Sequence, residues 1–95
     1  MNITIHSVSD LGLALRATRK GSKIRLDDLA DFAGVSKQFV SDVEHGKQTV
    51  QLGLVLRLLT EMGLILTVDI PSGAESELAR LKAKVGSAPN RQKVA

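Results

Sequence analysis

Apolar residues return at helical spacing in four stretches of the first 62 residues, each bounded by residues that cap or break helices. The predicted helices span residues 11–20, 26–33, 36–45 and 52–62. Ser9 and Asp10 supply a cap for the first helix, and Gly21 with Ser22 is its expected stop. The last helix is apolar on nearly all sides, so we expect it near the centre of the fold. Its stripe consists of Leu52, Val55, Leu56, Leu59 and Met62.

The middle of the chain is typical of two short helices joined by a tight turn. Gly34 stands where the chain needs a left-handed residue, a conformation that glycine adopts without cost. Val35 follows as an expected buried plug, and Ser36 is the expected cap of the next helix. The predicted inward positions are Leu29, Ala30 and Ala33 of the first helix and Val40 and Val43 of the second. The other face of the second helix is left to polar side chains.

Two short β-prone segments flank this helical region. Residues 64–70 read LILTVDI, and residues 2–6 read NITIH with alternating character. An isolated short strand has no stability of its own, so each needs an edge to pair with. The partner of 64–70 is either residues 2–6 of the same chain or the equivalent strand of a second copy.

Composition changes after Pro71, which divides the chain into a folded domain over residues 1–70 and a tail over 71–95. Residues 75–85 form up to three helical turns with Leu78, Leu81 and Val85 on one side. So short a helix is marginal in water by itself. Residues 86–95 have almost no apolar content, and we expect them to be disordered. The tail is therefore predicted to be flexible, and it is basic.

The net charge of the chain is weak evidence for nucleic-acid binding by the folded domain. The net charge is +3 and the pI about 9.6, but residues 1–70 carry eight basic and eight acidic side chains. The excess therefore lies in residues 71–95, with five basic and two acidic side chains. Within the domain, the run from Arg16 to Arg25 holds five cations and no acid. A nucleic-acid surface is indicated by this local run rather than by net charge.

Composition also excludes several classes of protein. A chain of 95 residues without cysteine has no disulfide or thiolate metal site, which fits a cytoplasmic, nucleoid-associated protein. No apolar run approaches a membrane span, and the N-terminus has no secretory signal. No nucleophile–base pair, metal cluster or phosphate loop is visible. We therefore expect no enzyme activity, no cofactor and no metal.

The exposed face of the 36–45 helix carries side chains suited to reading DNA. Base edges in the major groove are read by residues near the start of an inserted helix. Gln38 can pair with adenine, Lys37 can donate to guanine, Ser41 suits either, and Asp42 can accept from cytosine. The helix start at Ser36 also offers free N–H groups to a phosphate.

These motifs carry a family resemblance. Residues 11–62 resemble the Cro/cI-type helix-turn-helix domain of bacterial and phage repressors, through LADFAGVS across the turn and FVSDVEHGK after it. With TVQLGLVLRLLTEMGL included, the chain is most similar to the HipB-type antitoxins of type II toxin–antitoxin modules. The resemblance implies an all-α, compact four- to five-helix domain with a short C-terminal β-strand that pairs across a dimer.

The same resemblance implies partners and roles. It places base reading on Lys37, Gln38, Ser41 and Asp42 and backbone contacts on Lys47 and Thr49. It also makes Arg19 and Glu44 a salt bridge between the first and third helices. The implied protein is a homodimer on a palindromic operator, acting as antitoxin and autorepressor for a HipA-like kinase toxin. A stand-alone regulator without a toxin and an interaction domain without DNA binding remain the alternatives.

The chain departs from the family pattern where the second helix starts. A Thr-Gln or Ser-Gln pair is usual there, but this chain has Arg25 and Leu26. The capping side chain is then lost unless Asp27 replaces it, while Arg25 supplies a charge to the same phosphate. Lys23 occupies the place of a usual glycine, so we expect a differently shaped first turn.

Overall fold

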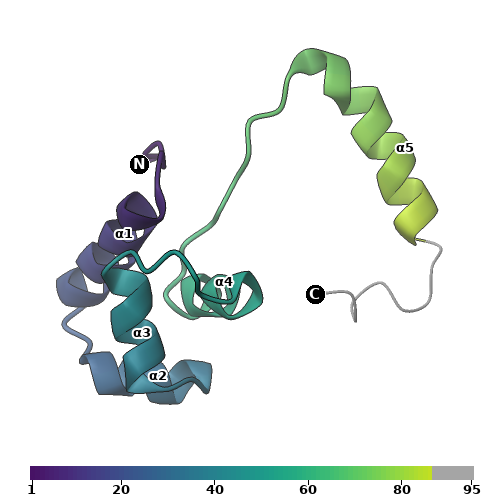
Figure 1. The fold of residues 1–95 in the computed structure, drawn as a ribbon. Coiled ribbons are helices and arrows are strands. Elements are labelled where there is room, and N and C mark those ends of the chain that lie inside the picture. Colours follow the sequence, from purple (N-terminus) through teal and green to yellow (C-terminus); the bar gives the residue numbers. More distant parts are fainter. Residues whose placement is uncertain (87–95) are drawn as a thin grey trace.

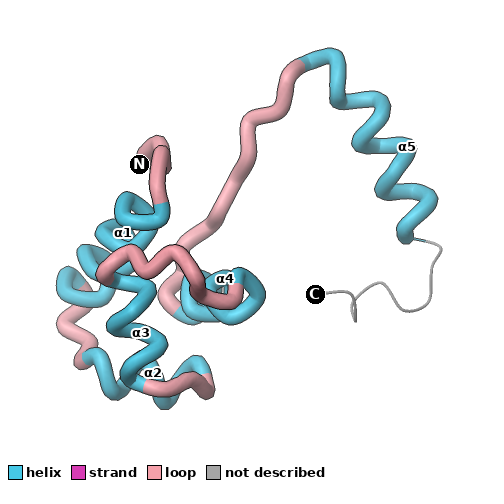
Figure 2. The backbone as a smooth tube through the Cα atoms, viewed as in Figure 1, coloured by secondary structure: helices cyan, strands magenta, loops and turns pink. Residues whose placement is uncertain are grey.

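The structure, a computed structural model that describes residues 1–86, is built from α-helices (Figure 1). The elements in chain order are α1 (Val8–Gly21), α2 (Leu26–Ala33), α3 (Lys37–Glu44), α4 (Leu52–Glu61), the 3₁₀ turn η1 (Ser72–Ala74) and α5 (Glu75–Gly86). Figure 2 shows helices and loops and no strand within these residues. The all-α prediction and the four- to five-helix count are confirmed.

One apolar core joins the first four helices, as α1 packs against α3, α3 against α2, and α2 against α4. The predicted inward residues of α2 and α3 are all buried, whereas Val35 is only half-buried. The buried apolar residues are Leu15, Leu29, Ala30, Ala33, Val40, Val43, Val55, Leu58 and Leu59. The predicted stripe of α4 was wrong in part, because Leu52 and Leu56 are 63% and 41% exposed. A helix apolar on most sides leaves its inward face ambiguous until its neighbours are known.

Helix α1 starts earlier than predicted. Its N-cap is Ser7, not Ser9, and the Ser7 hydroxyl accepts a 3.1 Å hydrogen bond from the Asp10 amide. The Asp10 carboxylate in turn accepts a 2.9 Å bond from the His6 amide. These two bonds satisfy N–H groups that a start at Leu11 would leave to water, much as a capping box does.

Helices α1 to α4 all end in the same pair of hydrogen bonds around a left-handed residue, which is the C-cap itself in α2 and follows the C-cap in the other three. Gly34, Gly46 and Gly63 take that conformation after α2, α3 and α4. After α1 it is taken by Lys23, with φ of 57°, and the Ile24 amide donates to the Arg19 carbonyl at 3.1 Å. The stop at Gly21 and Ser22 is confirmed, but the left-handed residue is Lys23. A side chain in this conformation is strained.

Replacing Lys23 with glycine is therefore expected to stabilise the domain. Glycine removes the strain of the left-handed residue but costs entropy in the unfolded chain, which leaves a gain of about 0.5–1 kcal/mol. Urea denaturation of the two proteins measures the difference. An unchanged or lower free energy of unfolding would argue against a strained Lys23.

Gly12 marks the closest approach of α1 to α3. A Cβ at Gly12 would lie 2.3 Å from the Val43 carbonyl oxygen and 2.8 Å from the Glu44 carbonyl oxygen. Both atoms are backbone and cannot turn aside. We expect Gly12→Ala to destabilise the domain by about 1–3 kcal/mol, although alanine normally favours a helix.

Gly21 provides the matched control in the same helix, because a Cβ there meets nothing within 4 Å. Gly21→Ala is expected to be neutral or slightly stabilising. Similar thermal unfolding of the two variants would contradict the close contact at Gly12.

Two segments predicted as strands have no regular secondary structure in the single chain. Residues 64–70 run extended from α4 towards η1, with Ile65 and Val68 exposed by 88% and 79% (Figure 1). One groove is lined by residues 1–5, by residues 64–67 and by Asp69, with Leu11 and Leu59 among its other lining residues. A strand that pairs across a dimer needs a second chain, so this prediction stays a prediction.

Helix α5 forms over the stretch where up to three turns were predicted. None of its residues is buried. The predicted flexibility of the tail stays untested. Of residues 86–95, where disorder was expected, Gly86 is the last residue of α5, and residues 87–95 lie outside the described residues.

Candidate nucleic-acid interface

Helix α3 begins at a turn that leaves its first residues facing outward. The Gly34 turn after α2 brings the chain back, and the Val35 amide donates to the Ala30 carbonyl at 3.0 Å. Ser36 then caps α3, its hydroxyl accepting a 3.0 Å bond from the Phe39 amide. The predicted cap is confirmed. The hydroxyl of Ser36 is thus already used, and a phosphate at this end would meet the remaining backbone N–H groups.

The polar face of α3 forms a connected set of side chains. Lys37 and Gln38 are exposed, while Ser41 and Asp42 one turn later are half-buried. The Gln38 amide nitrogen donates to Asp42 Oδ1 at 2.8 Å, and Lys47 Nζ lies 3.5 Å from Asp42 Oδ2. The Gln38 hydrogen bond is the main cause that lowers the pKa of Asp42, with the charge of Lys47 adding to it. An ionised Asp42 is an acceptor only, so it orients the amide nitrogen of Gln38 towards itself.

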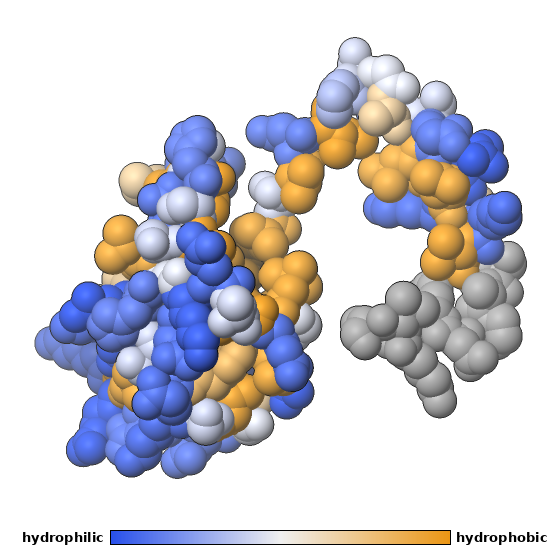
Figure 3. Space-filling model, viewed as in Figure 1, coloured by the Kyte–Doolittle hydropathy of each residue, from blue (hydrophilic) through white to orange (hydrophobic). Residues whose placement is uncertain are grey.

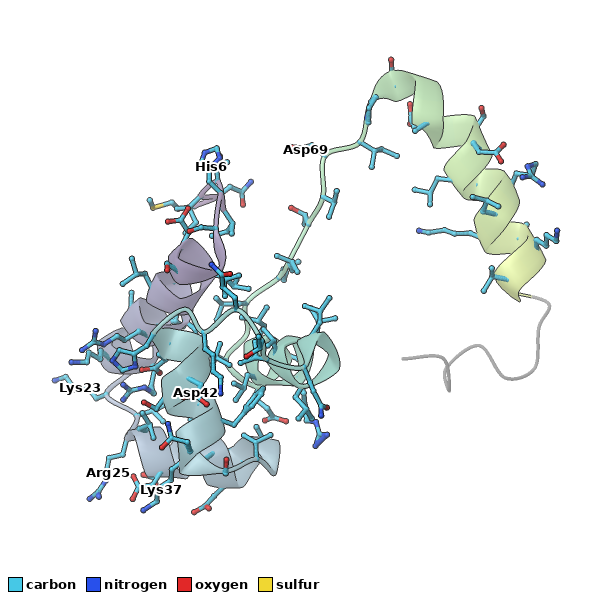
Figure 4. All side chains as sticks on the ribbon, viewed as in Figure 1. His6, Lys23, Arg25, Lys37, Asp42 and Asp69 are labelled. Atoms are coloured by element: carbon cyan, nitrogen blue, oxygen red, sulfur yellow. The ribbon has the colours of Figure 1, made fainter. Side chains whose placement is uncertain are left out.

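Cations gather where the first turn meets α3. Arg25 donates to both carboxylate oxygens of Asp27 at 3.2 Å, and Lys37 Nζ lies 3.9 Å from Asp27 Oδ2. The Arg25 hydrogen bond is the main cause that lowers the pKa of Asp27. The Arg25 and Lys37 side chains remain 77% and 70% exposed. Figure 4 shows Lys23, Arg25 and Lys37 on the same side of the molecule.

Lys23 was not among the predicted contact residues. It belongs to the acid-free run from Arg16 to Arg25, and this run was the signal that could have pointed to it. Its left-handed backbone turns the chain between α1 and α2, and its side chain lies on the same side of the molecule as that of Arg25 (Figure 4).

No side chain caps α2, because Arg25 occupies the cap position and directs its guanidinium to Asp27. Asp27 does not take the cap either, since its two oxygens receive the Arg25 hydrogen bonds. With Arg25 in place of the usual Thr or Ser, α2 therefore lacks the hydrogen bond that a capping side chain would make.

The Arg19–Glu44 salt bridge is confirmed and buried. Arg19 Nε lies 2.6 Å from Glu44 Oε2, Arg19 Nη2 lies 2.9 Å from Oε1, and the two residues are 9% and 3% exposed. Arg19 also donates to the Ile24 carbonyl at 3.0 Å. The hydrogen bonds that Arg19 donates to Glu44 raise the pKa of Arg19. The pair ties α1 and the following turn to the end of α3, which fixes the angle at which α3 is presented.

The other predicted contact residues follow α3. Lys47 and Thr49 are exposed in the loop before α4, so they lie beyond the C-terminal end of the helix that Ser36 starts. His45 Nδ1 lies 2.7 Å from the Ser41 carbonyl oxygen, which keeps the imidazole against α3. Among residues 1–86, no three His, Asp or Glu side chains gather as metal ligands.

Polar and apolar side chains lie on different parts of the surface, and the predicted contact residues lie on the polar part. In Figure 3, hydrophilic side chains dominate over α1 to α3, while apolar ones gather along α4 and the segment that follows it. No helix within the described residues is long and apolar enough to cross a membrane.

A capped helix set across a second helix by a glycine turn, with an exposed polar face, defines a helix-turn-helix protein. The family model described as "Helix-turn-helix domain" matches residues 10–64, so the chain belongs to this family. It is a helix-turn-helix transcriptional regulator. A relative of Sinorhizobium fredii, the uncharacterized HTH-type transcriptional regulator y4mF, is 39% identical over 67 residues, which cover 70% of this chain and 88% of that protein.

Solved structures share the fold at lower identity. A HipA–HipB–O2–O3 complex contains a chain with a TM-score of 0.68 and 20% identity, covering 75% of this chain and 100% of its own. A chain in a HipB–O4 20mer complex has a TM-score of 0.67 at the same identity and coverage. The resemblance to HipB found in the sequence thus extends to the fold.

Proposed function

We propose that this regulator is a dimeric, sequence-specific repressor that acts as antitoxin and autorepressor of an operon encoding a HipA-like kinase toxin. The observation that carries the proposal is the capped N-terminal turn of α3, where Lys37 and Gln38 stand exposed. The toxin partner is supported by the fold shared with HipB, since one neighbour is a complex of HipB with HipA. Binding occurs on the nucleoid in the cytoplasm and needs no cofactor or catalysis.

Three polar residues of α3 contact bases, and a fourth orients one of these three. Lys37, Gln38 and Ser41 meet base edges in the major groove. Gln38 reads adenine with its amide oxygen and the amide hydrogen that Asp42 does not bind. Asp42 contributes by holding that amide, because its oxygens already face Gln38 and Lys47.

Phosphates are bound around this reading surface. The start of α3 at Ser36 offers backbone N–H groups to one phosphate. Arg25, at the N-cap position of α2, offers its positive charge to another. Lys47 and Thr49 contact the backbone on the far side of α3. Such contacts set register and affinity, and they make binding depend on salt.

Dimerisation follows from the need for discrimination. A few side chains in one half-site supply about 1–3 kcal/mol per base pair, which is too little to select one site in a genome. Two copies one helical turn apart read a palindrome. Pairing of residues 64–70 between copies would cover side chains such as Ile65 and Val68 that the single chain leaves exposed.

Footprinting on the chain's own upstream DNA, followed by a promoter reporter, tests the proposal. We expect protection of a palindrome with half-sites about 10 base pairs apart and repression that is lost when either half is scrambled. Binding that ignores sequence would support an interaction domain instead.

A stand-alone regulator is the second candidate. The relative from S. fredii is named as a transcriptional regulator without mention of a toxin. Affinity purification of the full chain expressed with its neighbouring gene separates the two candidates. We expect a kinase-sized partner in stoichiometric amount, whereas operator binding without any partner would favour the stand-alone regulator.

A further inference from the structure

Helix α5 carries an apolar strip that no other part of residues 1–86 covers. Leu78, Leu81 and Val85 are 39%, 43% and 50% exposed, and no residue of the helix is buried. Figure 3 shows apolar side chains along the inner side of this helix. A helix of 12 residues is marginal in water without tertiary contacts. Its stability therefore requires a partner for the strip.

The spacing of the strip is that of a coiled coil. Ala74, Leu78, Leu81 and Val85 are separated by four, three and four residues, as core positions of successive heptads are. The positions flanking this core hold Glu75, Glu77, Lys82 and Lys84. Charges at flanking positions select the partner and orientation of paired helices. We propose that α5 pairs in antiparallel orientation with α5 of a second copy of this chain.

Charge complementarity selects both the partner and the direction. In an antiparallel pair with Leu78 facing Leu81 of the other copy, the acidic start of each helix lies beside the basic end of its partner. Glu75 then faces Lys82 and Glu77 faces Lys84, so each flanking acid meets a flanking base. Glu77 also accepts two hydrogen bonds from Arg80 of its own helix, so Lys84 of the other copy adds a second cation to an existing ion pair. A parallel pair brings together only Glu77 and Lys82, so it forms one kind of charge pair between the helices where the antiparallel pair forms two. Acidic starts and basic ends also match the dipole of each helix.

The path of residues 64–86 keeps the strip away from the domain that α1 to α4 form. Residues 64–70 lead away from α4, and the turn at η1, where the Ala74 amide donates to the Pro71 carbonyl at 2.9 Å, reverses the chain into α5 (Figure 1). The helix thus stands clear of the core that α1 to α4 share. In the dimer proposed above, the domain holds the two copies of α5 together and raises their local concentration. A short helix can then be long enough to form a stable pair.

Cysteine cross-linking tests the pairing, because the natural chain contains no cysteine. Full-length Ala74→Cys and Val85→Cys proteins are mixed in a glutathione redox buffer and separated on a non-reducing gel. In the antiparallel pair these positions face each other within the roughly 7 Å that a disulfide spans, whereas two copies of Cys at 74 lie about 16 Å apart. The expected product is the mixed disulfide.

Each other product overturns the proposal. Disulfides between identical variants indicate a parallel pair. Cross-linking no faster than that of Ala83→Cys, which lies on the opposite side of α5, indicates that α5 faces another partner or solvent. The readout needs no DNA, so it stays informative whether or not the chain proves to be a repressor.

A charge in the strip provides a second measurement. Leu81→Glu is expected to weaken self-association of the full chain by roughly tenfold or more in sedimentation experiments, with Ala83→Glu as the matched control. Equal self-association of the two variants would contradict the proposed pairing.

Discussion

Replacing Arg19 with methionine is expected to destabilise the domain by about 3–5 kcal/mol, a large part of the stability of a domain this size. The substitution leaves Glu44 as a buried, uncompensated carboxylate, since the guanidinium supplies both of its hydrogen bonds at 2.6 and 2.9 Å. It also frees the Ile24 carbonyl that Arg19 binds. Chemical denaturation of the two proteins measures the loss.

Arg25 provides the control for this experiment. Its ion pair with Asp27 is also bidentate but exposed, and solvent screening leaves such a pair little effect on stability. Arg25→Met should therefore unfold close to the natural protein. Replacing Arg19 and Glu44 together by methionine and leucine should recover part of the stability, because no unpaired charge is then buried. An Arg19→Met protein as stable as Arg25→Met would contradict the structural role assigned to the pair.

The helix-turn-helix core was predictable because its signals are local. The bounds of α2 follow from its apolar spacing and from Gly34, and the Ser36 cap follows from a serine directly before a periodic stretch. These features depend on residues within one turn of each other, and tertiary packing agrees with them. The salt bridge of Arg19 and Glu44 spans 25 residues and was reached through the family resemblance rather than through spacing.

The start of α1 and the inward face of α4 were predicted wrongly for another reason. At each of these places the sequence allows two conformations or orientations, and tertiary packing selects one. Ser7 and Ser9 are both capable caps, and the reciprocal bonds of Asp10 favour Ser7. Helix α4 has leucine on most sides, so its inward face is set by the positions of α2 and the other helices. Lys23 is left-handed because Ile24 must turn back to the end of α1, although glycine is the residue usual there.

The sequence predicted that four polar side chains share one face of α3, which the structure shows, while their contacts with DNA stay a prediction. Lys37, Gln38, Ser41 and Asp42 were expected from their place on α3. The sequence did not predict the hydrogen bond from Gln38 to Asp42, and this bond is why we propose Asp42 as a support for Gln38 rather than as a reader of cytosine. Their spacing of four residues permitted this bond, but competing partners such as water or DNA were equally consistent with the sequence.

If α3 reads DNA, the largest loss of specific DNA binding is expected from Lys37→Ala combined with Gln38→Ala. Both side chains are exposed, so their loss should leave the fold intact. In a dimer the double variant removes two base contacts in each of two half-sites. At about 1–3 kcal/mol per contact, specific affinity should fall by roughly a thousandfold or more, towards non-specific binding.

The most direct measurement is a salt-titrated mobility shift that compares the operator with a scrambled duplex. Thr60→Ala combined with Glu61→Ala provides the control, because these adjacent residues are exposed near the end of α4. We expect the natural protein and the control to prefer the operator at every salt concentration. The double variant should bind both duplexes equally while keeping its helical circular dichroism. A double variant that still prefers the operator would contradict reading by α3.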